Sequence, residues 1–259
     1  MSDPIERTIS EMTDADVLIW HASTAELLSD VVARRLMSAL SREERARHAG
    51  FVFAENRAEF LLAHAMKRIV IGRYTGVPPR DLAFVADQNG KPGLAAQFGM
   101  GRIGFSLSHS GGVVVVAIAA TTRVGVDVES TRRTVSAQSI IAALSEREAV
   151  LIDRLRGHER RRCAFAHWTA REAFSKAVGL GLSLPREDVS FEISGNDQPT
   201  LVDVGAEYGQ PGDWRFFQNW ISDQQVVTGA IMASPGGEMN WQLRGFRRLF
   251  DDALEAGEI

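Results

Sequence analysis

Two acidic side chains, Asp127 and Glu129, lie two positions apart in the segment VGVDVE (124–129). If this segment is a β-strand, its strict alternation places the three valines on one face and both carboxylates on the other. Carboxylates held so close repel each other unless a cation lies between them, and oxygen ligands of this kind suit Mg²⁺. An acidic, solvent-facing strand edge has the same pattern, so the spacing alone leaves both interpretations open.

A second group lies in WTAREAFSK (168–176), where Trp168, Glu172 and Lys176 share one face of a helix. This face presents a third carboxylate together with a lysine. An ordinary Glu-Lys pair on a helix surface, contributing roughly 0.3 to 0.5 kcal/mol, has the same spacing. The next residues, GLGLSLP (179–185), end the helix with two glycines, which allow backbone to approach whatever Lys176 faces.

Polar side chains also gather at two turns. Three donors, Ser108, His109 and Ser110, end the segment FSLSHS (105–110) directly before two glycines, as an anion or phosphate site requires. A lone histidine is nevertheless more often a packed or surface residue than a ligand. The turn NGKP (89–92) exposes Lys91. The run RRR (160–162) is typical of the solvated side of a helix.

The composition bounds the class of protein. The 259 residues include 33 acidic and 29 basic side chains, so no basic excess indicates nucleic acid or an anionic membrane as a partner. The longest apolar run, 113–120, is shorter than the roughly 20 residues that cross a bilayer. Residues 1–16 lack the apolar segment of a secretory signal, and the single Cys163 excludes an internal disulfide or a thiolate-rich zinc site. We therefore expect a cytoplasmic protein in which oxygen or histidine ligands hold any metal.

The elements that must position these residues follow a similar order twice. In the first round, a strand at 17–23 and a helical stretch at 24–40 precede the capping box Ser41 to Glu44. This capping box opens a long helix toward Tyr74, with a break expected near Gly50. Strands are then predicted at 82–86, 103–107, 113–119 and 124–129.

The second round begins with another capping box, Ser145 to Glu148, and a helical region to about Val178. Strands are predicted after it at 189–193, 201–204, 214–221 and 225–233. This repetition predicts an α+β fold built from two similar α/β halves, 1–130 and 131–234. For the C-terminal extension, 235–259, a peripheral helix and a mobile tail both remain open.

The four motifs, in this order, resemble the 4′-phosphopantetheinyl transferase superfamily, and specifically its long, Sfp-type branch. They are NGKP (89–92), FSLSHS (105–110), GVDVE (125–129) and W-x-x-R-E-A-x-x-K-x-x-G (168–179). The resemblance covers roughly residues 40–184. It implies a pseudo-dimeric fold and a chain that acts as a monomer.

The resemblance also implies a reaction. Members of this family move the 4′-phosphopantetheine group of coenzyme A to a serine of an apo acyl or peptidyl carrier protein, releasing adenosine 3′,5′-bisphosphate. In this chain it implies Asp127, Glu129 and Glu172 as Mg²⁺ ligands, with Glu172 or a metal-bound water taking the serine proton. Lys176 would contact the pyrophosphate and stabilise or protonate the leaving group, so Glu172 and Lys176 are the catalytic candidates.

The coenzyme A contacts implied by the resemblance are Lys91, Pro92, Ser108 and His109, besides Lys176. A basic residue near the start of the first long helix often meets the 3′-phosphate in this family. Arg57 is the nearest candidate for that contact, although Ala58 or Glu59 could fill the matching position. The family's usual lysine before the Glu-Ala pair is Arg171 here, which keeps the charge but changes the donor geometry.

Two other functions use the same residues. A Mg²⁺-dependent nucleotide phosphohydrolase would use the acids with water as the nucleophile. A non-catalytic coenzyme A-binding regulator would keep the fold without turnover, but such a binder has no need of the full set of Asp127, Glu129, Glu172 and Lys176. The sequence does not identify the carrier protein or its pathway.

Overall fold

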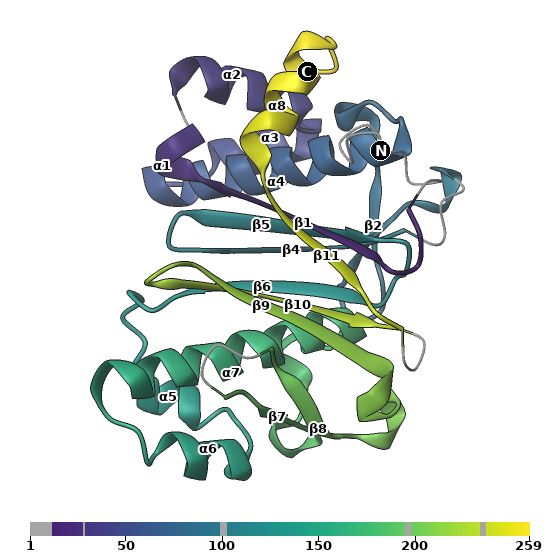
Figure 1. Ribbon diagram of the computed structural model, residues 1–259. Coiled ribbons are helices and arrows are strands. Elements are labelled where there is room, and N and C mark those ends of the chain that lie inside the picture. Colours follow the sequence, from purple (N-terminus) through teal and green to yellow (C-terminus); the bar gives the residue numbers. More distant parts are fainter. Residues whose placement is uncertain (1–11, 28, 99–102, 195–197, 234–236) are drawn as a thin grey trace.

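The computed structural model describes residues 12–27, 29–98, 103–194, 198–233 and 237–259. They form four layers, in which two β-sheets face each other and helices cover both outer faces (Figure 1). The elements of the first half are β1 (Asp16–Ser23), α1 (Thr24–Leu27), α2 (Asp30–Ala39), α3 (Arg42–Ala49), α4 (Ala54–Thr75), β2 (Phe84–Ala86), β3 (Pro92–Leu94), β4 (Gly104–Ser110) and β5 (Val113–Ala119).

The second half repeats this order. Its elements are β6 (Val124–Ser130), α5 (Ala137–Ile141), α6 (Glu146–Ile152), α7 (Gly157–Val178), β7 (Val189–Glu192), β8 (Thr200–Val204), β9 (Trp214–Ser222) and β10 (Gln225–Met232). The strands β1-β5-β4 lie in the same spatial order as β6-β10-β9, and each half adds a two-stranded hairpin, β2-β3 or β7-β8. The predicted α+β fold with two similar halves is therefore confirmed.

The two long helices end near the predicted residues, but they begin later than predicted. The capping boxes open the short helices α3 and α6, whereas α4 and α7 begin at Ala54 and Gly157 without a side-chain cap. Both capping boxes form, at Ser41 and at Ser145, and the first helical region breaks after Gly50 into α3 and α4. Gly76 and Gly179 end α4 and α7 with φ of 69° and 84°, a left-handed conformation that glycine adopts without a Cβ clash. Each long helix therefore stops at a fixed point beside its sheet.

The core between the sheets consists of aliphatic side chains on the facing strands. Val115 and Ala117 of β5 meet Val126 and Val128 of β6 in one buried cluster. The opposite face of the first sheet packs on α4, and α7 packs on the second sheet (Figure 1). The strand alternation predicted for 124–129 is confirmed, because the valines of β6 face the first sheet.

A buried carboxylate joins each capping box to its long helix. In the first half, Glu44 accepts hydrogen bonds from Lys67, at 3.1 Å, and from Arg68, and its Oε1 lies 2.8 Å from His64 Nδ1. Arg68 also donates to the backbone carbonyls of Pro79 and Leu82. These bonds fix α3 and the segment after α4 to one side of the long helix.

The second half places the same residue types at the same spacing. Glu148 of its capping box is buried and accepts from the Phe191 backbone amide at 3.0 Å. His167 and Arg171 of α7 are four residues apart, as are His64 and Arg68 of α4. Arg171 donates to backbone carbonyls after α7, as Arg68 does after α4. The duplication thus extends to the buried polar groups.

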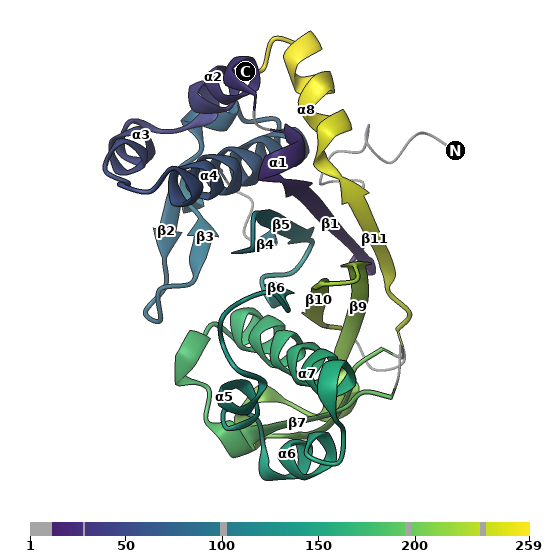
Figure 2. The same ribbon diagram turned by 90° about the vertical axis from the view of Figure 1, so that its left-hand side faces the viewer.

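The C-terminal segment packs onto the first half. The strand β11 (Asn240–Gly245) pairs in parallel with β1, and α8 (Phe246–Glu255) buries Leu249 and Phe250 in the cluster that contains α4 (Figure 2). The helix that was one of the two alternatives is therefore present as α8, and the strand β11 that precedes it was not predicted. The division at residues 130 and 234 remains a prediction, and β6, which it assigns to the first half, pairs with β10 of the second sheet.

The strand β11 also contacts the second sheet. The Trp241 ring stacks on Phe217 of β9 with centroids 5.7 Å apart. A Cβ on Gly229 of β10 would lie 2.6 Å from the Trp241 ring, so glycine is required for this close approach. One side of the interface between the halves is therefore filled by β11.

Candidate active site

A glycine brings α7 against β6. A Cβ on Gly125 would lie 2.0 Å from the backbone oxygen of Ala173, so only glycine allows the helix to approach this closely. Asp127 lies two residues further along β6 on the same face, and Glu172 and Lys176 lie on the adjoining turns of α7. The two predicted groups, one on a strand and one on a helix, therefore meet.

Asp127 is buried, with 4% of the residue exposed. Its Oδ1 accepts from Lys176 Nζ at 2.7 Å and from Ser108 Oγ at 2.7 Å. Its Oδ2 is buried and has no hydrogen-bond partner among the residues that the structure describes. Burial raises the pKa of this carboxyl, against the opposing effect of Lys176. Oδ2 is therefore the oxygen of this carboxyl that is available to a further partner.

Glu129 is also buried, but both of its oxygens have partners. Ser110 Oγ donates to Oε2 at 2.8 Å, and Trp168 Nε1 donates to Oε1 at 3.3 Å. Arg133, four residues along the chain, donates to Oε1 as well. The carboxylate is therefore held by groups from β4, α7 and the loop after β6.

Glu172 adds a third carboxylate. Burial raises its pKa to about 7, and the neighbouring charge of Asp127 acts in the same direction. Lys176 pairs with Asp127, so the predicted alternative of an ordinary surface pair with Glu172 is wrong. A carboxyl with this pKa exchanges its proton near neutral pH.

The donor set fits a hard divalent cation in its chemistry. Asp127, Glu129 and Glu172 offer oxygen ligands, the buried Asp127 Oδ2 lacks a partner, and mutual repulsion raises the pKa of Glu172. Within the described ranges, no three His, Cys, Asp or Glu side chains are close enough together to form a closed metal cage. Lys176 and Arg133 instead neutralise the two carboxylates of β6.

Three alternate serines of β4 face β6. Ser106 Oγ accepts from the Val126 backbone amide at 3.0 Å, while Ser108 and Ser110 each donate to a carboxylate. The sequence analysis singled out Ser108 as a phosphate contact, whereas the structure bonds it to Asp127. Ser110, also predicted as a donor for an anion, bonds instead to Glu129. The role of Ser106 was missed, although the period of two beside an acidic strand was a visible signal.

His109 points away from the serines. Its side chain is 49% exposed, and its Nδ1 lies 3.2 Å from Glu59 Oε2. Glu59 Oε1 also accepts from the Gly112 backbone amide at 2.6 Å, so this acid ties α4 to the β4-β5 turn. Arg57 donates to the backbone oxygen of Phe51 at 2.5 Å. At the start of α4, the residue that contacts His109 is thus the acidic Glu59 and not the basic Arg57.

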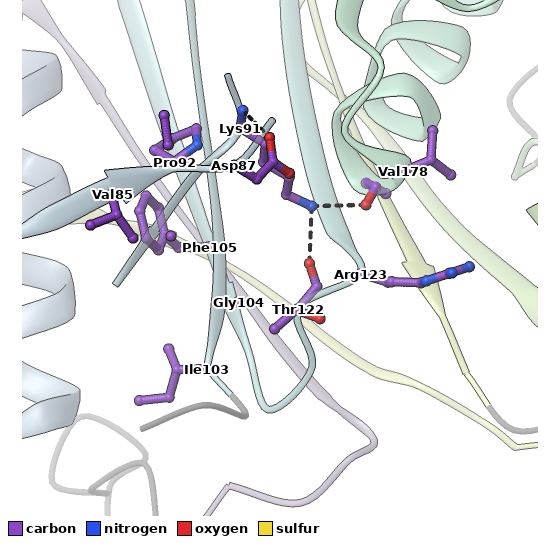
Figure 3. A pocket seen from close by; sticks show the side chains of 13 residues that line it. Val85, Asp87, Lys91, Pro92, Ile103, Gly104, Phe105, Thr122, Arg123 and Val178 are labelled. Carbon is purple, nitrogen blue, oxygen red and sulfur yellow. Dashed lines mark hydrogen bonds between the residues drawn. The ribbon is translucent and has the colours of Figure 1, made fainter. Parts of the chain in front are cut away.

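Lys91 and Pro92 line a cavity of about 340 Å³ between the β2-β3 hairpin and the end of α7 (Figure 3). Lys91 Nζ donates to the backbone oxygens of Thr122, at 2.9 Å, and Ala177, at 2.8 Å. Burial lowers the pKa of Lys91 to about 8. The lysine is therefore less exposed than its turn predicts, and it links the two halves. The other lining residues are Val85, Ala86, Asp87, Gly93, Ile103, Gly104, Phe105, Thr122, Arg123, Ala177 and Val178.

Arginines of α7 hold neighbouring segments. The guanidinium of Arg171 donates to the backbone oxygens of Leu184, Pro185 and Arg186. The run at 160–162 is not simply a solvated face. Arg161 donates to the backbone oxygens of the loop at 131–135, and Arg162 lies over the Trp220 ring at 3.5 Å. These arginines hold loops in place.

Two duplicated α/β halves, with buried carboxylates and a lysine where they meet, define a site suited to an anionic, phosphate-bearing substrate. The family described as the 4′-phosphopantetheinyl transferase superfamily matches residues 123–228. The family of 4′-phosphopantetheinyl transferase N-terminal domains matches residues 20–122. The chain belongs to the 4′-phosphopantetheinyl transferase superfamily, in its long, Sfp-like branch, and is an enzyme of this transferase type.

Similar proteins come from bacteria and animals. The 4′-phosphopantetheinyl transferase HetI of Nostoc sp. is 33% identical over 208 residues, covering 80% of this chain and 82% of its own. Sfp of Bacillus subtilis is 28% identical over 174 residues, covering 67% and 75%. The mouse L-aminoadipate-semialdehyde dehydrogenase-phosphopantetheinyl transferase is 25% identical over 245 residues, covering 84% and 73%.

Among solved structures, a holo-(acyl-carrier-protein) synthase from Bacillus anthracis, in complex with CoA (3′,5′-ADP), is 19% identical. The match has a TM-score of 0.34 and covers 43% of this chain and 96% of that chain, a likeness too distant to support any assignment. In the parts of the chain described above, no helix combines the length and apolar character of a membrane span.

Proposed function

We propose that the protein transfers the 4′-phosphopantetheine group of coenzyme A to a serine of an apo acyl or peptidyl carrier protein, with Mg²⁺, and releases adenosine 3′,5′-bisphosphate. The observation that carries this proposal is the buried, unpartnered Oδ2 of Asp127, beside Lys176 on its other oxygen. We further propose that the chain acts as a monomer, because both halves of the site lie in one polypeptide. We also propose that it acts in the cytoplasm.

Asp127, Glu129 and Glu172 would hold the cation. When bound, Mg²⁺ supplies positive charge that offsets the negative charge of the pyrophosphate in the transition state. Lys176 bonds Oδ1 of Asp127, so a cation held by Oδ2 would lie beside its ammonium. From there Lys176 would contact the pyrophosphate and stabilise the leaving phosphate.

The nucleophile of the reaction is the carrier serine, whose proton must be removed as its oxygen attacks phosphorus. Glu172, with a pKa raised to about 7, is suited to take this proton either directly or through a water. The phosphorus-oxygen bond to the adenosine bisphosphate breaks as the bond to the serine oxygen forms, so the leaving phosphate takes up the displaced electron pair. Glu172 and Lys176 thus have opposite tasks on the two sides of the transferred group.

Two further regions are proposed contacts for coenzyme A. The exposed His109 would meet a phosphate through the ring nitrogen that Glu59 leaves free. The cavity beside Lys91 and Pro92 would take another part of the nucleotide, since it combines apolar walls with the cations of Lys91 and Arg123 (Figure 3). Ser108 and Arg57 remain candidates, although each already has a partner within the chain.

One incubation distinguishes this proposal from the two alternatives. The protein is mixed with coenzyme A, Mg²⁺ and a panel of apo carriers from fatty-acid, polyketide and nonribosomal-peptide systems, and the products are analysed by mass spectrometry. Transfer adds about 340 Da to the carrier, the mass of the arm that this cofactor carries. A nucleotide phosphohydrolase would cleave coenzyme A without modifying any carrier. A regulator would bind coenzyme A and leave both molecules intact.

A further inference from the structure

The hydroxyl of Ser110 has a fixed direction. Ser110 is buried at the end of β4, and its Oγ accepts from the Ser130 backbone amide at 3.3 Å. The single proton of this hydroxyl is directed to Glu129 Oε2, at 2.8 Å. Both contacts cross from the first half to the second. Ser110 therefore ties the end of β6 to β4 and orients one carboxylate oxygen at the same time.

The other oxygen of Glu129 is held from different elements. Trp168 of α7 and Arg133 of the following loop both donate to Oε1. A carboxylate oxygen accepts more than one hydrogen bond, so Oε2 retains capacity for a cation while Ser110 holds it. The hydroxyl and the indole together fix the plane of the carboxylate.

We propose that Ser110 is a positioning residue, which holds Glu129 in the orientation that binds the divalent cation. This inference rests on the proposed function, in which Glu129 is a metal ligand. Partners that orient metal ligands typically change metal affinity by about 10- to 100-fold when they are removed. The first half thus contributes to a metal site whose three carboxylates all come from the second half.

The experiment measures Mn²⁺ binding to the full chain by electron paramagnetic resonance, without coenzyme A, since Mn²⁺ prefers the same oxygen ligands as Mg²⁺. Ser110→Ala is expected to raise the Kd for Mn²⁺ by about tenfold or more. Ser110→Thr retains a hydroxyl and is expected to restore part of the affinity. Ser106→Ala is the matched control, because Ser106 lies on the same face and also accepts a β6 backbone amide, but bonds to no carboxylate. It is expected to change the Kd less than twofold.

A double-mutant cycle tests whether Ser110 acts through Glu129. In a Glu129→Gln background, Ser110→Ala is expected to change the Kd for Mn²⁺ very little. An equal loss of affinity in both backgrounds would overturn the positioning role, as would a Ser110→Ala variant that binds Mn²⁺ like the wild type but melts at lower temperature. Wild-type protein that binds no Mn²⁺ would overturn the metal site itself, and the role of Ser110 with it.

Discussion

At the scale of single residues, Asp127 is a buried carboxyl whose Oδ2 has no hydrogen-bond partner among the residues that the structure describes. Replacing it by Asn keeps the shape but removes the negative charge, so the proposed cation site would lose its most buried carboxylate. We expect turnover at saturating Mg²⁺ to fall by on the order of 100-fold or more, with the melting temperature unchanged or higher, because burial disfavours the ionised form.

Carrier phosphopantetheinylation, followed by mass spectrometry, measures the rate of the Asp127→Asn variant, and calorimetry measures its stability. Asp203→Asn is the control, since Asp203 is an exposed strand residue of β8. Turnover above a tenth of the wild-type rate would remove Asp127 from the ligand set.

The raised pKa of Glu172 predicts that metal binding depends on pH. Its pKa of about 7 means that the carboxyl is largely protonated below pH 7, and a cation must displace that proton to bind. Mn²⁺ affinity should therefore weaken as the pH falls below 7, by up to about tenfold per pH unit for one displaced proton. In Glu172→Gln the affinity should be lower at pH 7.5, and its pH dependence should be reduced.

Titration calorimetry between pH 6 and 8 measures both effects on Mn²⁺ binding. An unchanged pH slope in the Glu172→Gln variant would mean that another group loses the proton. The pKa of Asp127 is also raised, so Asp127 is the first other group to test, by the same titration of Asp127→Asn.

Several site residues were predictable from the sequence because they depend on local periodicity. Alternation in a strand and the 3.6-residue repeat of a helix are sufficient to place Asp127 with Glu129, and Glu172 with Lys176. The bonds between these groups were not predictable. The ion pair of Lys176 with Asp127 and the bond of Ser110 to Glu129 join residues 49 and 19 positions apart. Such contacts are set by tertiary packing.

At the scale of elements, the separation of α7 from β6 controls the site. Gly125→Ala would place a methyl group 2.0 Å from the Ala173 backbone oxygen, which has no room to move within a helix. We expect the helix to shift away from β6, with stability reduced by about 1 to 3 kcal/mol and turnover reduced together with it. Urea unfolding and the transfer assay measure the two effects.

Gly212→Ala is the matched control for this substitution. A Cβ on Gly212 would meet no heavy atom within 4 Å, so neither stability nor turnover should change. A Gly125→Ala variant with wild-type stability and rate would show that α7 and β6 tolerate a wider separation than the contact indicates.

The duplicated buried histidines predict how stability depends on pH. His167 is 2% exposed, and burial lowers its pKa, so it stays neutral in the folded protein. In the unfolded chain a histidine binds a proton below about pH 6.5. The unfolded state is therefore favoured as the pH falls below 6.5, by at most about 1.4 kcal/mol per pH unit for each such histidine.

Urea unfolding of the wild type and His167→Gln at pH 7 and pH 5 measures this effect. The variant should lose less stability than the wild type between the two pH values. His158→Gln, at an exposed position of the same helix, should lose as much as the wild type. Equal losses in all three proteins would assign the acid sensitivity to other groups, beginning with the buried His64.

Helix boundaries were more predictable than the packing of arginines. Capping boxes and helix-ending glycines are local signals. The short helices α3 and α6 start at the capping boxes, and both long helices end at the glycines. Arg161 and Arg171 satisfy backbone oxygens in loops that are distant in sequence. The charge of the run at 160–162 favoured a solvated face, and nothing in the sequence indicated these partners of Arg171, because a sequence does not show which carbonyls lack a partner.

At the scale of the whole molecule, the joint formed by β11 should contribute to stability without contributing to catalysis. Trp241 stacks on Phe217 and fills the space above Gly229. We expect Trp241→Ala to reduce stability by about 2 kcal/mol, less than the roughly 3 to 5 kcal/mol for a fully buried aromatic, because Trp241 is partly buried. The kcat measured below the melting transition should stay within about twofold of the wild type.

Calorimetry and the transfer assay at 20 °C test this separation of stability from rate. Trp220→Ala offers a comparison on the same sheet, because Trp220 of β9 packs against Arg162 and lies away from β11. A large loss of kcat in a folded Trp241→Ala variant would mean that the two sides of the interface are coupled.

The pairing of β11 was missed at the sequence level for a general reason. Parallel pairing with β1 joins residues 224 positions apart, such as Asp16 and Asn240, and no local pattern encodes a partner so distant. The duplication of the halves, by contrast, was visible because each half repeats its own local signals in order.

The strand β11 also makes the two edges of the interface between the duplicated halves unequal. At one edge of this interface, β4 meets β6 through serines and carboxylates. At the other edge, β11 lies beside β1 and contacts β9 through aromatic packing. A chain with an internal repeat could present two equivalent clefts, but here β11 occupies one of them. We therefore expect substitutions between β4 and β6 to lower turnover, and substitutions beside β11 to lower stability. A deep mutational scan measures this difference. When the selection is changed from turnover to folding alone, substitutions between β4 and β6 should become tolerated, and substitutions beside β11 should remain harmful.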